Sequence, residues 1–271
     1  MSSLDDSLNS ISLQKPNGQP PNLPSMDEYG NLLPQLLAEP RMCPAGCGIS
    51  WLTQAFMIFK DQFLLWLAIG VAYLIIAVIG SSIPVLNFIF PFISFVFIGG
   101  IIKGCADQAA NRELKFDHLF SAFYTHLKPL IILFILYLVA IIVVMIPMVL
   151  IFGGMVFSLA QQPSDTAVMG ILVGGLFAAA LLFPVFMAIW FAPTLIVLHD
   201  IEPVEAMKMS FKGCLKNILP FLVFGIVAPI LTILAVIFTL GLAILVLFPI
   251  GMITYYTSYR DVWTDQPLSV E

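Results

Sequence analysis

Residues 63–102 read FLLWLAIGVAYLIIAVIGSSIPVLNFIFPFISFVFIGGII and contain no charged residue. One membrane-spanning helix needs about 20 predominantly apolar residues, and this stretch is about twice that length. The sequence Gly80-Ser81-Ser82-Ile83-Pro84 interrupts it near the midpoint. Because glycine and proline are the strongest local breakers of regular structure, we expect two spans joined by a tight turn.

The whole chain shares this character, with 60% hydrophobic and only 10% charged residues and a mean hydropathy of +1.02. A soluble domain has about 25% charged residues, so this chain must be surrounded by lipid. Residues 1–42 are the exception, because they are rich in Ser, Asn, Pro and acids. They lack the features of a signal peptide, and we expect a disordered tail there. The low pI of about 5.1 argues against a nucleic-acid partner.

Further apolar runs extend the pattern to an all-α membrane domain over residues 43–263, followed by a short tail at 264–271. The third run is expected to end at Gly153-Gly154, and Pro184 and Pro193 to kink or end the fourth. Thr239-Leu240-Gly241 is the expected turn between the last two. The six predicted transmembrane helices cover residues 63–80, 84–102, 130–152, 168–190, 218–238 and 241–258 and form three hairpins.

The positive charges give an independent argument for an even number of spans. All Lys and Arg residues lie before the first span, between the second and third, between the fourth and fifth, or after the sixth. The three other connections carry none. Because positive residues favour the cytoplasmic side, we expect both termini in the cytoplasm; a five-span topology would place Arg260 outside.

A related segment precedes each predicted hairpin: QAFMIFK at 54–60, SAFYTHLK at 121–128 and MSFKGCLK at 209–216. Each has a small residue, Phe, an apolar residue and then Lys, with apolar positions at helical spacing. We interpret them as three amphipathic helices on the cytoplasmic membrane surface, one before each hairpin; the alternative is that any membrane-entry helix shows this order. The expected lipid and interface anchors are Trp51, Phe56, Lys60, Phe123, Lys128, Phe211 and Lys216.

These units, together with WFAPTLIVLHDIEPVEAM at 190–207 and YTSYRDVW at 256–263, resemble a group of uncharacterised bacterial inner-membrane proteins. The group has six helices and is related to the YciC-like family and to the membrane domain attached to some glycerophosphodiesterases. The resemblance covers residues 43–263 and implies a fold and a location in the bacterial inner membrane. It implies no activity. This chain departs from the pattern at the entry turn, where Cys43 and Cys47 replace an apolar and a basic residue.

No predicted span contains Asp, Glu, Lys, Arg or His, although such a residue at membrane depth usually marks function. Asn87 is the deepest amide, and interhelical packing or a contact with a substrate could explain it. The histidines His118, His126 and His199 lie in the cytoplasmic connections. Asp117-His118 and His199-Asp200 are adjacent in sequence, and adjacent helical residues do not face one another. We therefore predict no catalytic residue and no cofactor.

All four cysteines fall on the predicted cytoplasmic side, where a disulfide is not expected. Cys43 and Cys47 could contribute to a zinc site, which we retain as a minority hypothesis. Reversible acylation is a further alternative. The main interpretation is that the thiols are small apolar residues in the packing of the entry turn.

The sequence thus predicts a non-enzymatic integral inner-membrane protein that acts through lipid or partner-protein contacts, or through self-association, in envelope maintenance. A permease for an uncharged or apolar solute, with proline-interrupted helices as its pathway, is the alternative. It requires a polar cavity that contains Asn87 or Thr254. An enzyme acting on a lipid headgroup is a more distant alternative.

Overall fold

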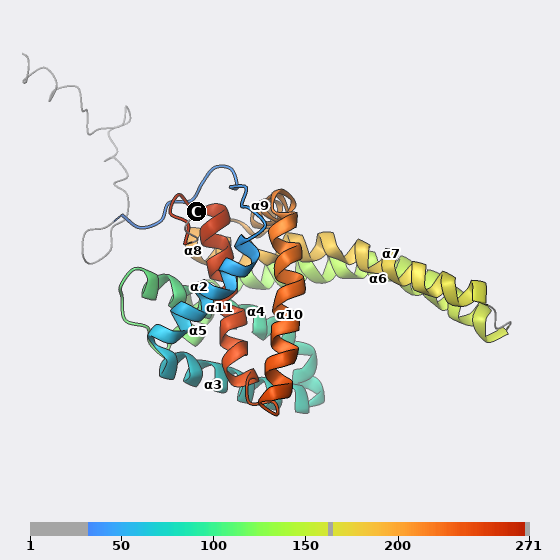
Figure 1. Cartoon of the computed structure of the whole chain (residues 1–271), viewed down its shortest axis with the longest axis horizontal. Coiled ribbons are helices and arrows are strands. Elements are labelled where there is room, and N and C mark those ends of the chain that lie inside the picture. The colour runs from blue at the N-terminus through green and yellow to red at the C-terminus, as the bar shows by residue number, and fades with distance from the viewer. Residues whose placement is uncertain (1–31, 162–164, 269–271) are drawn as a thin grey trace, which may run out of the picture.

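The computed structural model describes residues 32–161 and 165–268, and this part of the chain is all-α, as predicted (Figure 1). Leu36 and Thr264 form an isolated antiparallel bridge. The helices are α2 (Cys47–Asp61), α3 (Phe63–Ser82), α4 (Pro84–Ala109), α5 (His118–Thr125), α6 (Leu127–Gln161), α7 (Asp165–Trp190), α8 (Ala192–His199), α9 (Pro203–Lys216), α10 (Ile218–Phe238) and α11 (Ile244–Trp263).

Five segments in the described part are long and apolar enough to cross a membrane by length and composition, and they match the first five predicted spans in order. They are Phe63–Ser82, Ile89–Ala109, Leu127–Phe157, Val173–His199 and Ile218–Phe238. α11 takes the place of the sixth predicted span but is not among them, because its second half carries hydroxyl groups and the charged pair Arg260-Asp261. The arrangement of six spans as three hairpins therefore stays a prediction.

The predicted breaks within the first and last hairpins are confirmed. α3 ends at Ser82, Ile83 is extended, and Pro84 begins α4, where proline is favoured because its missing N–H has no partner there in any case. α10 ends at Phe238, and the turn places Leu240 at φ 52° and Gly241 at φ 94°. A positive φ favours glycine, which has no Cβ to clash with the backbone.

The third and fourth predicted spans differ from the structure. α6 continues through Gly153-Gly154 to Gln161, so the predicted end there is wrong. Glycine lowers helix stability by only about 1 kcal/mol relative to alanine, and the apolar sequence around it continues. α7 likewise passes through Pro184, and the break falls at Phe191, after which Pro193 lies in the first turn of α8.

The three predicted interfacial helices are present as α2, α5 and α9, and each ends at the same kind of break before the next helix. The break residues Gln62, His126 and Asn217 have φ between −131° and −121° and ψ between 22° and 50°. Seven positions before each break stands a fully buried residue, Ala55, Leu119 or Ser210. Matching geometry at three places supports true internal repetition over coincidence.

The core of the bundle lies around the second half of α11. α11 packs against α2, α3 and α4, and its residues from Ile253 to Trp263 are buried apart from the half-buried Tyr255. Residues 32–42 lie along the C-terminal end of α11: Leu37 N donates to Trp263 O at 2.9 Å, and Arg41 N to Val262 O at 2.7 Å. The predicted disordered tail therefore does not extend to residue 42, and its residues 1–31 lie outside the described part.

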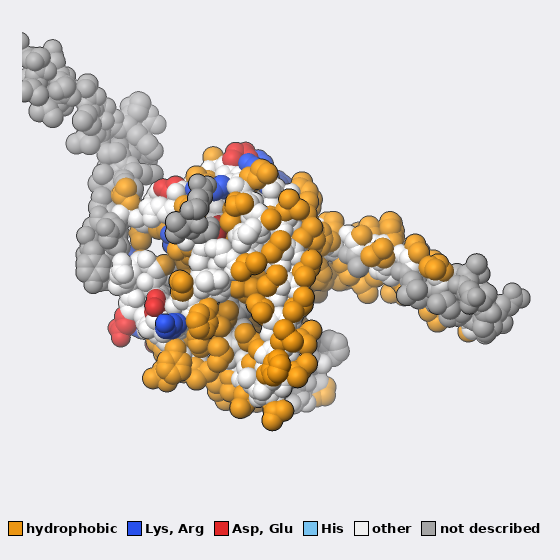
Figure 2. Space-filling model, viewed as in Figure 1, with side chains coloured by type: hydrophobic (Ala, Val, Ile, Leu, Met, Phe, Trp, Pro, Cys, Tyr) orange, Lys and Arg blue, Asp and Glu red, His pale blue; other side chains and the backbone are white. Residues whose placement is uncertain are grey.

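Figure 1 shows α6 and α7 side by side, projecting from one side of the bundle that holds α3, α4, α10 and α11. Near the bundle they contact α4, α8 and α9. Hydrophobic side chains cover α10 and much of the projecting pair, whereas acidic and basic side chains lie at the upper and left edges of this view (Figure 2).

Candidate functional site

A cavity of about 460 Å³ lies where the first described residues of the chain cross the ends of several helices. Its walls come from residues 33–36, the last turns of α4, the residue Arg112, the end of α8, and α11. The segments Ile89–Ala109 and Val173–His199 both end at this cavity. We call it the basic cavity, because Lys103, Arg112 and Arg260 line it together with one carboxylate, Asp107.

Arg260 is the most deeply placed of these cations, since its exposed fraction is only 7%. Its Nη1 donates to the hydroxyl of Tyr256 at 2.9 Å, and its Nε and Nη2 donate to the carbonyl of Gln266 at 3.2 and 2.9 Å. Both acceptors are neutral. Arg260 lines the cavity, and no ion pair among the described residues includes it.

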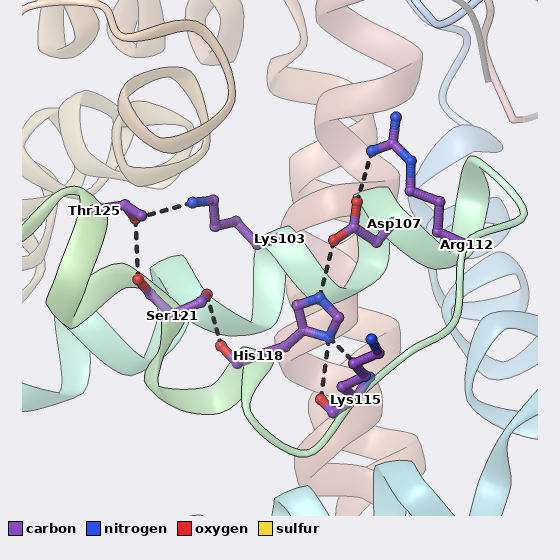
Figure 3. A network of polar contacts seen from close by, with 7 residues as sticks. All are labelled: Lys103, Asp107, Arg112, Lys115, His118, Ser121 and Thr125. Atoms are coloured by element: carbon purple, nitrogen blue, oxygen red, sulfur yellow. Dashed lines mark hydrogen bonds and ion pairs between the residues drawn. The ribbon is translucent and has the colours of Figure 1, made fainter. Parts of the chain in front are cut away.

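The carboxylate of Asp107 is already shared by two partners (Figure 3). Its Oδ1 accepts a hydrogen bond from Arg112 Nη1 at 2.9 Å, and its Oδ2 lies 2.9 Å from Nε2 of His118. This arrangement leaves Lys103 without a carboxylate partner. Lys103 Nζ instead donates to Thr125 Oγ1 at 2.9 Å, and this single bond uses one of its three donors.

Each histidine has a hydrogen-bond partner other than the acidic residue adjacent to it in sequence. His199 Nε2 is hydrogen-bonded to the hydroxyl of Tyr259, and His126 Nε2 lies 2.9 Å from Asp200 Oδ1. His118 bonds to Asp107 and not to Asp117. Neither adjacent pair is joined by a hydrogen bond among the described residues, and the absence of a catalytic role stays a prediction.

Cys43 and Cys47 lie close together. All four cysteines, including Cys105 and Cys214, are buried. Burial raises the pKa of the Cys43 thiol to about 12, and the neighbouring Cys47 is a smaller cause. The backbone N–H of Cys43 donates to Asn217 Oδ1 at 2.8 Å, and its thiol contacts the carbonyl of Asp261 at 3.7 Å. In residues 32–161 and 165–268, no group of three or more His, Cys, Asp or Glu side chains could hold a metal ion.

The prediction that Trp51 is an anchor at the membrane interface is wrong, because its side chain is fully buried. Its Nε1 donates to Asp261 Oδ2 at 3.0 Å, and its ring lies 5.0 Å from that of Phe221. Asp261 is itself only 1% exposed. An aromatic residue beside a membrane can face lipid or the protein interior, and this buried acceptor from the far end of the chain holds Trp51 inside.

The other predicted anchors are placed in several ways. Phe56 and Phe211 are exposed by 50% and 38%, and Phe123 is half-buried with its ring 5.1 Å from that of Phe97. Their contact with lipid stays a prediction. The side chains of Lys60, Lys128 and Lys216 are exposed, and Lys216 Nζ also donates to the carbonyl of Pro40.

Asn87 does not form the predicted packing contact, since it is exposed near the start of α4. Within the described residues its side chain makes no hydrogen bond, and only its backbone N–H bonds, to Ile83 O at 2.9 Å. The prediction that it joins two helices by a hydrogen bond is wrong. It lies near the turn end of its helix, which the neighbouring helices do not enclose.

Sequence reasoning missed Lys103, Arg260 and Asp261 as interacting residues. In the sequence, YTSYRDVW contributes to the resemblance and its Arg260 to the predicted topology, and neither predicts an interaction between residues. An Arg-Asp pair among aromatic residues at the end of an apolar helix is itself a signal, because charged groups there require partners. Asp261 takes its partner Trp51 from 210 positions away, whereas Lys103 bonds to Thr125, 22 positions away, and Arg260 to Tyr256 and Gln266 in its own segment.

Comparison with known proteins finds a relative by sequence similarity. The chain is similar to a probable inner membrane protein of Burkholderia thailandensis, with 29% identity over 194 residues that cover 67% of this chain and 72% of that protein. No family model matches the chain, and no solved structure matches it. The similarity and the five long apolar helices together indicate a multi-pass inner-membrane protein.

Proposed function

We propose that this chain is a non-enzymatic integral protein of the bacterial inner membrane, with both termini in the cytoplasm, that acts through contacts with membrane lipids. The main support is the exposed apolar surface of the spans. In α10, for example, Ile226, Ile230 and Ile237 are each at least half exposed. None of the residues in the most apolar 18-residue stretch of this helix is buried. A surface of this kind is stable only when it is covered by lipid or by another apolar surface.

Contacts with partner proteins or with a second copy of the chain are part of this proposal, and envelope maintenance is the process in which we place them. The proposal includes no cofactor. The histidines are hydrogen-bonded to Tyr259, Asp107 or Asp200, and the proposal assigns none of them a catalytic role.

The permease alternative gains no support from the basic cavity, because neither Thr254 nor Asn87 lines it. Thr254 is fully buried, and its hydroxyl donates to the carbonyl of Ile250 at 2.9 Å within its own helix. Asn87 is exposed in the first turn of α4. The α4 residues that line the basic cavity lie in the last turns of the same helix, at its opposite end.

The proposal is tested on the full chain in its native membrane. We expect the chain to resist alkaline carbonate extraction, to keep phospholipid after detergent purification, and to give a fluorescent but phosphatase-inactive C-terminal fusion. Alkaline phosphatase activity at the C-terminus would refute the topology. Asp200→Asn, at a carboxylate that is 89% exposed, should leave complementation of a deletion strain unchanged, whereas loss of complementation by a stably produced variant would favour an enzyme.

A further inference from the structure

The basic cavity carries more positive charge than its own residues neutralise. Lys103, Arg112 and Arg260 line it, and Asp107 is the one carboxylate in its lining. Both oxygens of Asp107 are engaged by Arg112 and His118. Two cations, one of them nearly buried, therefore remain without an anion among the described residues.

The state of Arg260 is the observation that most requires an explanation. Removing a charge from water is costly unless it is paired, and Arg260 has only neutral acceptors. A guanidinium has five N–H donors, and these three bonds leave one donor on each terminal nitrogen unused. A planar group with two free donors matches the oxygens of a phosphate.

The depth of the cavity points to a particular source of phosphate. Lys103 and Asp107 lie in the last two turns of one candidate span, and His199 is the last residue of another. Residues at the ends of membrane-spanning helices lie at the level of the lipid headgroups. Basic pockets between such helices on the cytoplasmic side are suited to anionic headgroups.

The remaining lining is suited to an amphiphile. Leu33, Leu36 and Leu198 form apolar wall next to the cations, and this wall could contact the glycerol and first methylene groups of a lipid. The volume of about 460 Å³ lies in the range of pockets that hold small organic ligands. An inorganic ion alone would leave most of this space and all of the apolar wall unused.

We propose that the basic cavity binds the phosphate of an anionic phospholipid headgroup, with Arg260 and Lys103 as its ligands. This inference rests on the proposed function, because it requires the cavity to lie at the cytoplasmic leaflet. It goes further in naming one site, one class of lipid and the two cations that select it.

The test uses the full chain, delipidated in neutral detergent and examined by native mass spectrometry while dioleoylphosphatidylglycerol or dioleoylphosphatidylcholine is added. We expect one phosphatidylglycerol per chain to bind at least tenfold more tightly than phosphatidylcholine. Lys103→Gln and Arg260→Lys should each weaken phosphatidylglycerol binding about tenfold or more, since one charge-assisted hydrogen bond is worth at least that much. Lysine retains the charge but lacks the planar fork of arginine.

Lys208→Gln is the matched control, because Lys208 is exposed on α9 and pairs with Glu205 outside the cavity. It should bind phosphatidylglycerol as the unchanged chain does. Equal weakening by Lys103→Gln and Lys208→Gln would overturn the proposal, as would equal binding of the two lipids by the unchanged chain. If Arg260→Lys does not fold, as judged by circular dichroism, Lys103→Gln carries the test.

Glycerol 3-phosphate and inorganic phosphate distinguish the source of the anion. Both should compete at least a hundredfold less well than phosphatidylglycerol. Competition at equal concentration would overturn the lipid and identify a free phosphate as the ligand. Failure of the proposed function looks different, because neither lipid would then remain bound, whereas failure of this inference alone would leave both lipids bound equally.

Discussion

Asp261 and Trp51 form a buried charge-assisted pair that joins the two ends of the membrane domain. Asp261 Oδ2 accepts from the indole of Trp51 at 3.0 Å, and its Oδ1 accepts from the backbone N–H of Leu268 at 2.7 Å. A buried carboxylate depends on such donors, because burial removes the water that would solvate its charge. The pair therefore links α2 to the end of α11.

Trp51→Phe should lower the free energy of unfolding by about 2 to 3 kcal/mol beyond the loss from the smaller ring, because a hydrogen bond to a charged group is removed. Trp190→Phe is the control: its indole contacts the same two rings, Phe221 and Phe224, but donates to the neutral hydroxyl of Ser258. Unfolding in a denaturing detergent series measures both variants. Equal losses in the two would show that the carboxylate does not depend on Trp51.

Burial of the Cys43 thiol should make the folded chain less stable at alkaline pH. Burial raises the pKa of its thiol from 9.0 to about 12 in the folded chain. The folded state thus holds this proton more tightly than the unfolded state, and the resulting stabilisation is complete below pH 9 and is lost as the pH rises toward 12. Relative to Cys43→Ala, the unchanged chain should lose about 1 to 2 kcal/mol of unfolding free energy between pH 8 and about pH 10.5. A difference that stays constant over this range would contradict the shift.

At the scale of elements, the crossing of α2 and α10 depends on one glycine. A Cβ at Gly48 would lie 2.3 Å from the carbonyl oxygen of Pro220 and 2.8 Å from the backbone nitrogen of Phe224. Backbone atoms cannot move aside as a side chain can, so Gly48→Ala should force the two helices apart and cost about 2 to 3 kcal/mol of unfolding free energy.

Gly46→Ala, two residues earlier, is the control for this crossing. A Cβ at Gly46 meets nothing within 4 Å, and its φ of −61° and ψ of −22° suit any residue. It should leave stability unchanged or raise it by about 0.5 kcal/mol, because alanine restricts the unfolded chain. Similar losses in both variants, measured by thermal unfolding in detergent, would show that α2 and α10 do not meet at Gly48.

Local features of the sequence predicted the elements well where a single residue determines the outcome. Pro84 and Gly241 fix the turns they were expected to fix, because φ restriction and a positive φ act within one or two residues. Gly153 and Pro184 did not end their helices, since continued apolar sequence on both sides outweighs one unfavourable residue. The same limit applies to the site: Lys103 and Arg260 line one cavity because α4 packs against α11, and no local sequence pattern contains that packing.

At the scale of the whole molecule, the α6–α7 pair is the feature least explained by packing within one chain. In its projecting part, Leu150 and Leu176 are 72% and 75% exposed, and Phe157 is 67% exposed. The candidate span Leu127–Phe157 has 31 residues, whereas about 20 suffice to cross the hydrocarbon core. A helix of this length must tilt in the bilayer or extend beyond it.

An apolar photoreactive diazirine that partitions into the bilayer will show what covers this pair. After reconstitution in phosphatidylcholine vesicles, we expect labelling along α10 and along the projecting part of α6, because lipid should contact both. Leu195 and Ile196 in α8 are fully buried and should remain unlabelled, which provides a control within the same molecule. Peptide mass spectrometry locates the label without any substitution.

The alternative occupant of this surface is a second copy of the chain or another membrane protein, and the same experiment separates the two cases. If α10 is labelled in vesicles while α6 is protected, and α6 becomes labelled when the chain is diluted into excess detergent, protein covers the pair and lipid does not. That result would redirect the proposed function from lipid contact toward assembly. Labelling of α6 in both conditions instead supports lipid as the partner, because a lipid-covered surface needs no second chain to remain stable.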